Sequence, residues 1–104
     1  MATLLAAGLL SPAFAGGDPT AGAAAYKAKR CAMCHQIAGQ GGKSGPALDD
    51  TGAKHDAAWL RQLVKDPKAV NPKSRMMAYP GISDKDLDDL VAYLTTLKTA
   101  PPRK

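Results

Sequence analysis

The chain has 104 residues, a formal net charge of +5 at pH 7, and only one Trp and one Phe beside three Tyr. This length allows one domain whose hydrophobic core lies near the lower limit for independent folding, so a bound cofactor would help to fill it. The positive charge does not form an arginine-rich stripe, and we therefore expect a basic surface that does not bind nucleic acid.

Residues 1–15 are uncharged and mostly apolar, and they end in Ala13-Phe14-Ala15. Small residues in this pattern are typical of a leader cleavage site, so we predict an export signal over residues 1–15 and a mature domain over residues 16–104 in the periplasm or elsewhere outside the cytoplasm. Pro12 argues against the alternative of a buried helix. The run is shorter than the roughly 20 residues that a membrane-spanning helix needs. No Lys or Arg precedes Lys27, so the true start of the leader is left open.

Two helices are predicted in the first part of the mature domain. Asp18 is a suitable N-cap and Pro19 suits a first helical position, so a helix is expected from Pro19 to Lys29. A middle helix is expected from about Asp56 to Val64, because Asp66-Pro67 forbids its continuation. The face of the first helix that we expect to be buried consists of Gly22, Ala25 and Tyr26.

The last helix has the clearest signals. Ser83 and Asp86 form a capping box, and Asp84 adds negative charge to the first turn. Apolar side chains then recur at helical spacing. No stretch alternates convincingly between apolar and polar residues, so we predict no strands and an all-α fold. The apolar positions of this helix are Leu87, Leu90, Val91, Leu94 and Leu97.

The most informative motif is Cys31-Ala32-Met33-Cys34-His35. Two cysteines three positions apart, followed directly by a histidine, are typical of a site that binds haem covalently. In such a site Cys31 and Cys34 form thioether bonds to the haem, and His35 binds its iron. A dithiol exchange centre and a zinc site are the alternatives. The first normally lies on an α/β fold and the second normally has two spaced histidines, so both fit poorly. The motif predicts one covalently attached haem c with its iron.

Two expected connections, over residues 36–55 and 65–82, are long for so small a domain. The first contains Gly39, Gly41, Gly42 and Gly45-Pro46, which bury almost nothing. Ordered loops of this length need a body to pack around. They support a bound haem independently of the cysteines.

A second axial ligand would come from a side chain on the opposite face of the haem, where a methionine thioether raises the reduction potential. Met33 lies too close to the attachment turn to reach that face. Met76 and Met77, in the second long connection, are both candidates. His55 is a further candidate, although a solvated helix start or a neighbour of a haem propionate is the commoner role for such a residue.

These residues, in this order, resemble the class I bacterial cytochromes c, which have one haem with histidine and methionine ligands. The resemblance extends from Gly16 to Lys98. Gly22 with Tyr26, and Leu90 with Tyr93, resemble the residues at which that family crosses its terminal helices. The resemblance therefore implies a small cytochrome c fold, with crossing N- and C-terminal helices, a shorter middle helix and long loops wrapped around one haem.

The resemblance also implies roles for single residues. Gly45-Pro46 resembles the segment whose proline carbonyl accepts a hydrogen bond from the ligand histidine, which makes Pro46 the partner of His35. Trp59 resembles a residue that the family often places beside a propionate, although core packing would explain it equally well. The family pattern Met-Pro-x-Phe/Tyr reads Met76-Met77-Ala78-Tyr79 here. Counting back from Tyr79 favours Met76 as the iron ligand, with Met77 as the alternative.

The function implied is that of an electron carrier, not an enzyme, which moves one electron at a time and has no small-molecule substrate. We expect a monomer that does not span a membrane and that meets redox partner proteins with acidic docking patches. A permanent haem subunit of a larger enzyme, and a gas or redox sensor with an open iron position, are the alternatives. The basic residues expected near the haem edge are Lys27, Lys29, Arg30, Lys65, Lys68, Lys73 and Arg75.

Overall fold

The computed structural model of the chain describes residues 17–99. The predicted export signal over residues 1–15 lies outside the described residues. Between residues 17 and 99, no helix is both long and apolar enough to cross a membrane. The elements in chain order are α1 (Pro19–Ala28), the short 3-10 helix η2 (Cys31–Met33), β1 (Gln36–Ile37), β2 (Gln40–Gly41), α2 (Thr51–Lys54), α3 (Ala57–Lys65), α4 (Pro67–Val70) and α5 (Asp84–Thr95).

The longest helices begin at the caps that the sequence predicts. Each N-cap side chain accepts a hydrogen bond from a backbone N–H group that has no partner within the helix. The expected first, middle and last helices correspond to α1, α3 and α5. Their cap bonds are Thr20 N–H to Asp18 Oδ1 at 3.0 Å, Trp59 N–H to Asp56 Oδ1 at 2.9 Å and Asp86 N–H to Ser83 Oγ at 3.1 Å.

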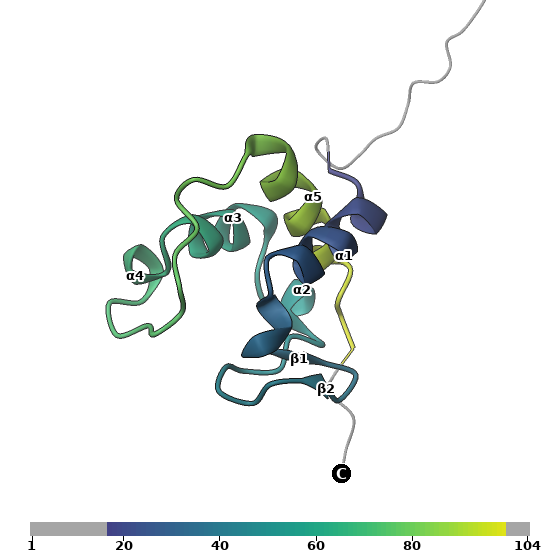
Figure 1. Ribbon diagram of the computed structural model, residues 1–104, viewed down its shortest axis with the longest axis horizontal. Helices are drawn as coiled ribbons and strands as arrows, with labels where there is room; N and C mark the ends of the chain where they lie inside the picture. The colour runs from purple at the N-terminus through teal and green to yellow at the C-terminus, as the bar shows by residue number, and fades with distance from the viewer. Residues whose placement is uncertain (1–16, 100–104) are drawn as a thin grey trace, which may run out of the picture.

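The crossing of α1 over α5 forms the centre of the fold (Figure 1). A Cβ atom at Gly22 would lie 1.9 Å from the Asp89 carbonyl oxygen and 2.6 Å from Tyr93 Cβ, so only glycine permits this approach. The rings of Tyr26 and Tyr93 meet edge to face with centroids 5.9 Å apart. The expectation that the terminal helices cross at these residues is confirmed.

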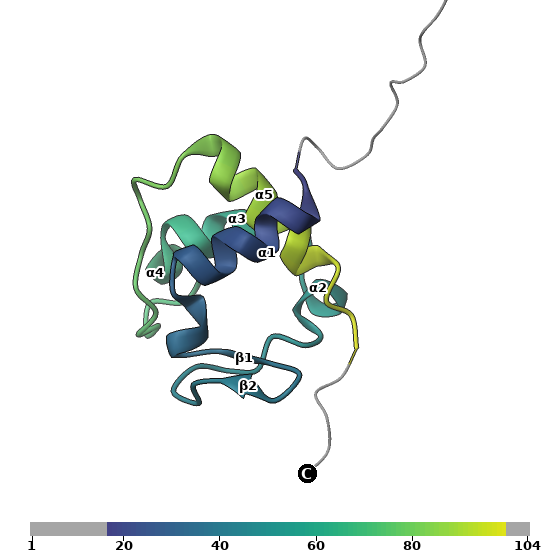
Figure 2. The ribbon, with the colours of Figure 1, turned by 45° about the vertical axis from the view of Figure 1, so that its right-hand side comes forward.

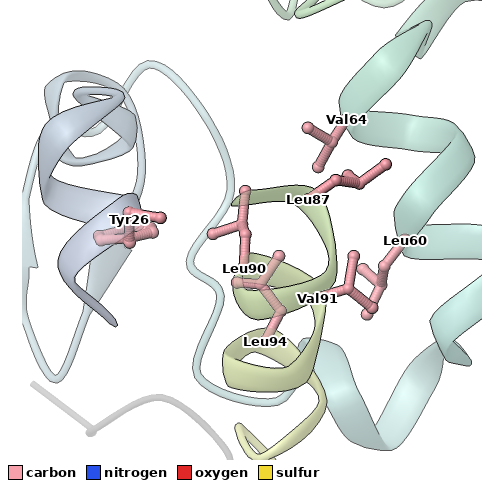
Figure 3. Close-up of a cluster of buried hydrophobic side chains, with 8 residues drawn as sticks. Tyr26, Leu60, Val64, Leu87, Leu90, Val91 and Leu94 are labelled. Atoms are coloured by element: carbon pink, nitrogen blue, oxygen red, sulfur yellow. The ribbon is translucent and has the colours of Figure 1, made fainter. Parts of the chain in front are cut away.

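The hydrophobic core lies on both sides of α5, between α1 and α3 (Figure 3). Leu90 faces Tyr26 of α1, whereas Leu87 and Val91 face the side chains of α3. Leu97 lies beyond the end of α5 but still packs, half-buried, against the same cluster. The buried members of the core are Ala25, Tyr26, Leu60, Val64, Leu87, Leu90, Val91 and Leu94.

The long connections contain regular structure that the sequence did not predict. The expectation of no strands is wrong, because β1 and β2 pair antiparallel, with Gln36 opposite Gly41 and Ile37 opposite Gln40. The turn between them places Ala38 and Gly39 at φ values of 54° and 81°, the left-handed conformation of tight two-residue hairpins. Strands of two residues are too short to show an alternating pattern. The helical fold class is unchanged.

Pro67 has a second effect on this part of the chain. The proline that forbids the continuation of α3 occupies the first position of α4. A proline fits there because the first N–H group of a helix has no partner within it. The connection after α3 therefore begins with a short helix before it turns back toward α5.

Candidate functional site

An apolar pocket lies between the helices and the two long connections. It is partly open to solvent, and its lining is almost entirely apolar. Figure 2 shows η2 and the two strands below α1, with the connection from α4 to α5 along one flank. The lining residues are Tyr26, Lys29, Cys31, His35, Leu48, Thr51, Leu60, Leu63, Val64, Met76, Tyr79, Ile82, Leu90 and Leu94.

His35 is held in one orientation by the backbone of the first connection. Its Nδ1 atom lies 2.8 Å from the Pro46 carbonyl oxygen. A carbonyl can only accept, so Nδ1 carries the hydrogen and the lone pair of a neutral imidazole is on Nε2. A Cβ atom at Gly45 would lie 2.8 Å from His35 Cε1, so glycine is what lets this segment come so close. The predicted pairing of His35 with Pro46 is confirmed, and it leaves Nε2 for a metal ion.

The cysteines lie in the turn just after α1. Arg30 has a φ of 63°, which ends the helical path and starts η2. Cys31 is half-buried and lines the pocket, whereas Cys34 is exposed. Burial raises the pKa of the Cys31 thiol, against smaller lowering effects of a backbone hydrogen bond and of Lys29. A reactive dithiol centre needs a lowered pKa, so this environment disfavours the dithiol alternative.

Met76 and Met77 differ sharply in their surroundings. Met76 is half-buried and lines the same pocket as His35, whereas Met77 is 68% exposed. The Met76 N–H group donates to Ser74 Oγ at 3.1 Å, and the Ser74 carbonyl accepts from Lys68 Nζ at 2.6 Å. Met33 is 65% exposed on η2. Of these three methionines, the structure brings only Met76 to the pocket with His35.

His55 and Trp59 lie together outside the pocket lining. Their rings stack with centroids 3.5 Å apart and an angle of 8° between the planes. Trp59 is half-buried and packs against the hydrophobic core. The structure therefore does not bring His55 to the pocket, and it gives Trp59 a packing contact.

Two lysines of the predicted basic group make contacts within the fold. Lys29 Nζ lies 3.6 Å from an Asp86 carboxylate oxygen, and Lys68 donates to the Ser74 carbonyl. The remaining members of the predicted basic group are exposed. They are Lys27, Arg30, Lys65, Lys73 and Arg75.

Two tyrosines line the pocket, and their hydroxyl groups differ in environment. Tyr26 is buried and its hydroxyl has no hydrogen-bond partner among the described residues. Burial, followed by the influence of Cys31, raises the pKa of Tyr26 to about 12, so its phenol stays neutral at physiological pH. The hydroxyl of Tyr79 donates to the Lys29 carbonyl at 2.8 Å. In the sequence, Tyr79 stands out only through its place in the family pattern Met-Pro-x-Phe/Tyr.

The residues present fit a haem. The pocket has an apolar lining, an imidazole whose Nε2 is available, a thioether, and an unpartnered phenol on a buried wall. Apolar walls suit the macrocycle, and nitrogen and thioether donors suit its iron. Cys31 and Cys34 would hold the haem by thioether bonds, and His35 and Met76 would supply the axial ligands.

The comparison with known families agrees with this chemistry. The sequence profile of the family described as cytochrome c matches residues 19–98. The chain belongs to the cytochrome c family. Haem c bound covalently, with its iron, is therefore its cofactor.

Characterised relatives cover the chain to different extents. Cytochrome c-550 of Nitrobacter winogradskyi is 33% identical in an alignment that covers 76% of this chain and 90% of that protein. Cytochrome c oxidase subunit 2 of Alkalihalophilus pseudofirmus is 31% identical over 81 residues, which cover 70% of this chain. The chain spans only 24% of the length of that oxidase subunit.

Solved structures show the same fold. A chain of SoxXA from P. pantotrophus superposes with a TM-score of 0.73 at 24% identity, over 82% of this chain and 85% of that one. Cytochrome c2 from Paracoccus denitrificans superposes with a TM-score of 0.58 at 23% identity, over 79% of this chain and 97% of that one. The small cytochrome c fold predicted from the sequence is confirmed.

Proposed function

We propose that this cytochrome c is an electron carrier outside the cytoplasm, with Cys31 and Cys34 as thioether attachments and His35 and Met76 as axial ligands. The observation that carries the proposal is that His35 and Met76 line one apolar pocket, while Met77 is 68% exposed. The bond from His35 Nδ1 to the Pro46 carbonyl supports it further, because such a bond fixes the tautomer that binds a metal through Nε2.

The haem supplies the chemistry, which is the reversible gain and loss of one electron at iron. The chain's own residues keep the site unchanged while this happens. Pro46 holds the imidazole of His35 in place, and Ser74 holds the backbone of Met76. Leu60, Leu63 and Val64 of α3 and Leu90 and Leu94 of α5 give the pocket apolar walls. A site that rearranges little and has apolar walls suits electron transfer, in which no bond is made and no substrate is bound.

Partner docking would use the exposed cations before the attachment turn and on the second connection. These are Lys27, Arg30, Lys65, Lys73 and Arg75. A monomer with such a surface suits brief contacts with an acidic patch on a redox partner. We expect the rate of electron transfer to an acidic partner to fall as ionic strength rises, because salt screens exposed charges. A rate that does not change with salt would contradict this docking mode.

A second candidate is a permanent haem subunit or domain of a larger redox enzyme. The relative named cytochrome c oxidase subunit 2 favours it, because this chain matches only 24% of a longer protein. Gel filtration of native extracts separates the two candidates. A free carrier elutes at the size of one small chain, and a subunit elutes with its complex.

The test of the main proposal is a redox titration of purified protein whose pigment stays with the chain after denaturation. We expect a single reversible one-electron step and slow binding of carbon monoxide to the ferrous form. Rapid carbon monoxide binding would indicate an open iron position and would support a sensor instead. Loss of the pigment on denaturation would contradict attachment through Cys31 and Cys34.

A further inference from the structure

Tyr79 joins the connection that contains Met76 to two helices. Its hydroxyl donates to the carbonyl oxygen of Lys29 at 2.8 Å, and its backbone N–H donates to the carbonyl oxygen of Val64 at 3.0 Å. Its own carbonyl accepts from the Ile82 N–H group at 3.2 Å. The ring is half-buried and lines the pocket. One residue therefore fixes the connection at its backbone and at the tip of its side chain.

The two carbonyl acceptors lie at the ends of α1 and α3. Lys29 is the C-cap of α1, and the positive φ of Arg30 turns the chain out of the helical path. Val64 is the penultimate residue of α3, before the turn at Asp66-Pro67. The last carbonyls of a helix have no partner within it and need one from elsewhere. Tyr79 satisfies one such group on each helix.

The bond from the Tyr79 hydroxyl spans the two halves of the candidate iron site. Lys29 lies two residues before Cys31, on the side of the attachment turn, whereas Tyr79 lies three residues after Met76. The sequence separation between Tyr79 and Lys29 is 50 residues, so the bond closes a long loop. Phenylalanine would fill the same volume without the hydroxyl, and this bond would be absent.

We propose that Tyr79 is a positioning residue for Met76: its hydroxyl ties the Met76 connection to the end of α1 and so keeps the thioether on the iron against competing ligands. The inference rests on the proposed role of Met76 as axial ligand. Its physical basis is an equilibrium between a closed connection and an open one, in which an external ligand binds only the open form. A bond made only in the closed form lowers the population of the open form and weakens the apparent affinity for the external ligand.

The test uses ferric holoprotein titrated with imidazole, with loss of the weak near-infrared band of iron–thioether ligation as the readout. Tyr79→Phe removes only the hydroxyl, and we expect imidazole to bind about fivefold more tightly, as the loss of one ordinary hydrogen bond predicts. Tyr93→Phe is the matched control, since it removes the same atom from a half-buried tyrosine outside the pocket lining. Its imidazole affinity should stay within twofold of the unmodified protein.

Two results would overturn the inference. An unchanged imidazole affinity in Tyr79→Phe together with a lower melting temperature would show that the hydroxyl only stabilises the fold. An equal increase in both variants would show a general loosening of the domain.

A Met76→Leu variant distinguishes this failure from failure of the proposed function. If that variant keeps the near-infrared band, Met76 is not the ligand and both proposals fall. If that variant loses the band and Tyr79→Phe behaves as the unmodified protein does, only the role of Tyr79 falls.

Discussion

The crossing of α1 with α5 and the connection over residues 65–82 are ordered in different ways. At the crossing, protein packs directly against protein, and even the Cβ position of Gly22 is filled by the backbone of the other helix. The connection instead contains Met77 at 68% exposure and a Gly81 with nothing near its Cβ position. Its order comes from a few long-range hydrogen bonds and from its side of the pocket.

The domain therefore has two apolar regions, the hydrophobic core around α5 and the pocket, and several residues belong to both. Leu60, Val64, Leu90 and Leu94 belong to both, since they are buried in the hydrophobic cluster and also line the pocket. The residues of the crossing are buried or half-buried without a ligand. The connections bury little until a large apolar body occupies the pocket. Substitutions at the crossing should therefore change global stability, and substitutions in the connection should change the iron site.

Preventing haem attachment should have the largest effect. In a Cys31→Ala, Cys34→Ala double variant we expect loss of cooperative thermal unfolding, because a core this small is marginal without its cofactor. Hydrogen exchange should then detect residual protection only at buried α5 residues such as Leu90, with none at Tyr79. Far-ultraviolet circular dichroism gives the matching loss of helix. Cooperative thermal unfolding of the haem-free chain, with hydrogen-exchange protection at both Leu90 and Tyr79, would contradict the view that only the connection depends on the haem for its order.

Glycine replacements test the helix crossing and the connection separately while the haem stays bound. Gly22→Ala should destabilise the holoprotein by about 3 kcal/mol, because the new methyl group overlaps the α5 backbone. Gly81→Ala is the matched control in the connection, and it should change the free energy of unfolding by less than about 0.5 kcal/mol. Denaturant titration measures both. Equal losses of unfolding free energy in the two variants would mean that the crossing is packed no more closely than the connection.

Acid stability should depend on a carboxylate at the crossing. Asp89 accepts from Lys85 Nζ at 2.6 Å and from the Asp18 N–H group at 3.0 Å, and these bonds, that to Lys85 first, hold the pKa of Asp89 below its ordinary value. Its stabilising effect is therefore complete above about pH 4, the ordinary pKa of an aspartate, and is lost as the pH falls through the depressed value.

Asp89→Asn tests this effect by removing the titrating group. The fall in melting temperature between about pH 4 and pH 2 should be shallower in this variant than in the unmodified protein. Asp66→Asn is the control, since Asp66 is exposed and makes no capping bond with its side chain. If both variants keep the full acid dependence, Asp89 is not a source of it.

Local rules were enough to predict the parts of the fold that depend on neighbouring residues. Asp18, Asp56 and Ser83 cap helices where the sequence indicates, and the leucine spacing of α5 marks its buried face. The bond between His35 and Pro46 also followed from the family resemblance. These features are encoded within a few residues or within one motif.

Long-range bonds and very short elements could not be predicted in this way. β1 and β2 have two residues each, and their turn places a non-glycine residue, Ala38, at positive φ. The bond from Tyr79 to Lys29 joins residues 50 positions apart and leaves no local pattern. The family spacing already favoured Met76 over Met77 as the proposed ligand, and burial adds an independent reason, because Met76 lines the pocket whereas Met77 is 68% exposed.

The most direct test of the account is the near-infrared band of iron–thioether ligation in Met76→Leu and Met77→Leu holoprotein. We expect the band to disappear in Met76→Leu, whose side chain lines the pocket, and to persist in Met77→Leu, whose side chain is exposed. The reverse pattern would contradict the account, because the iron would then be bound by a methionine that lies outside the pocket shared with His35.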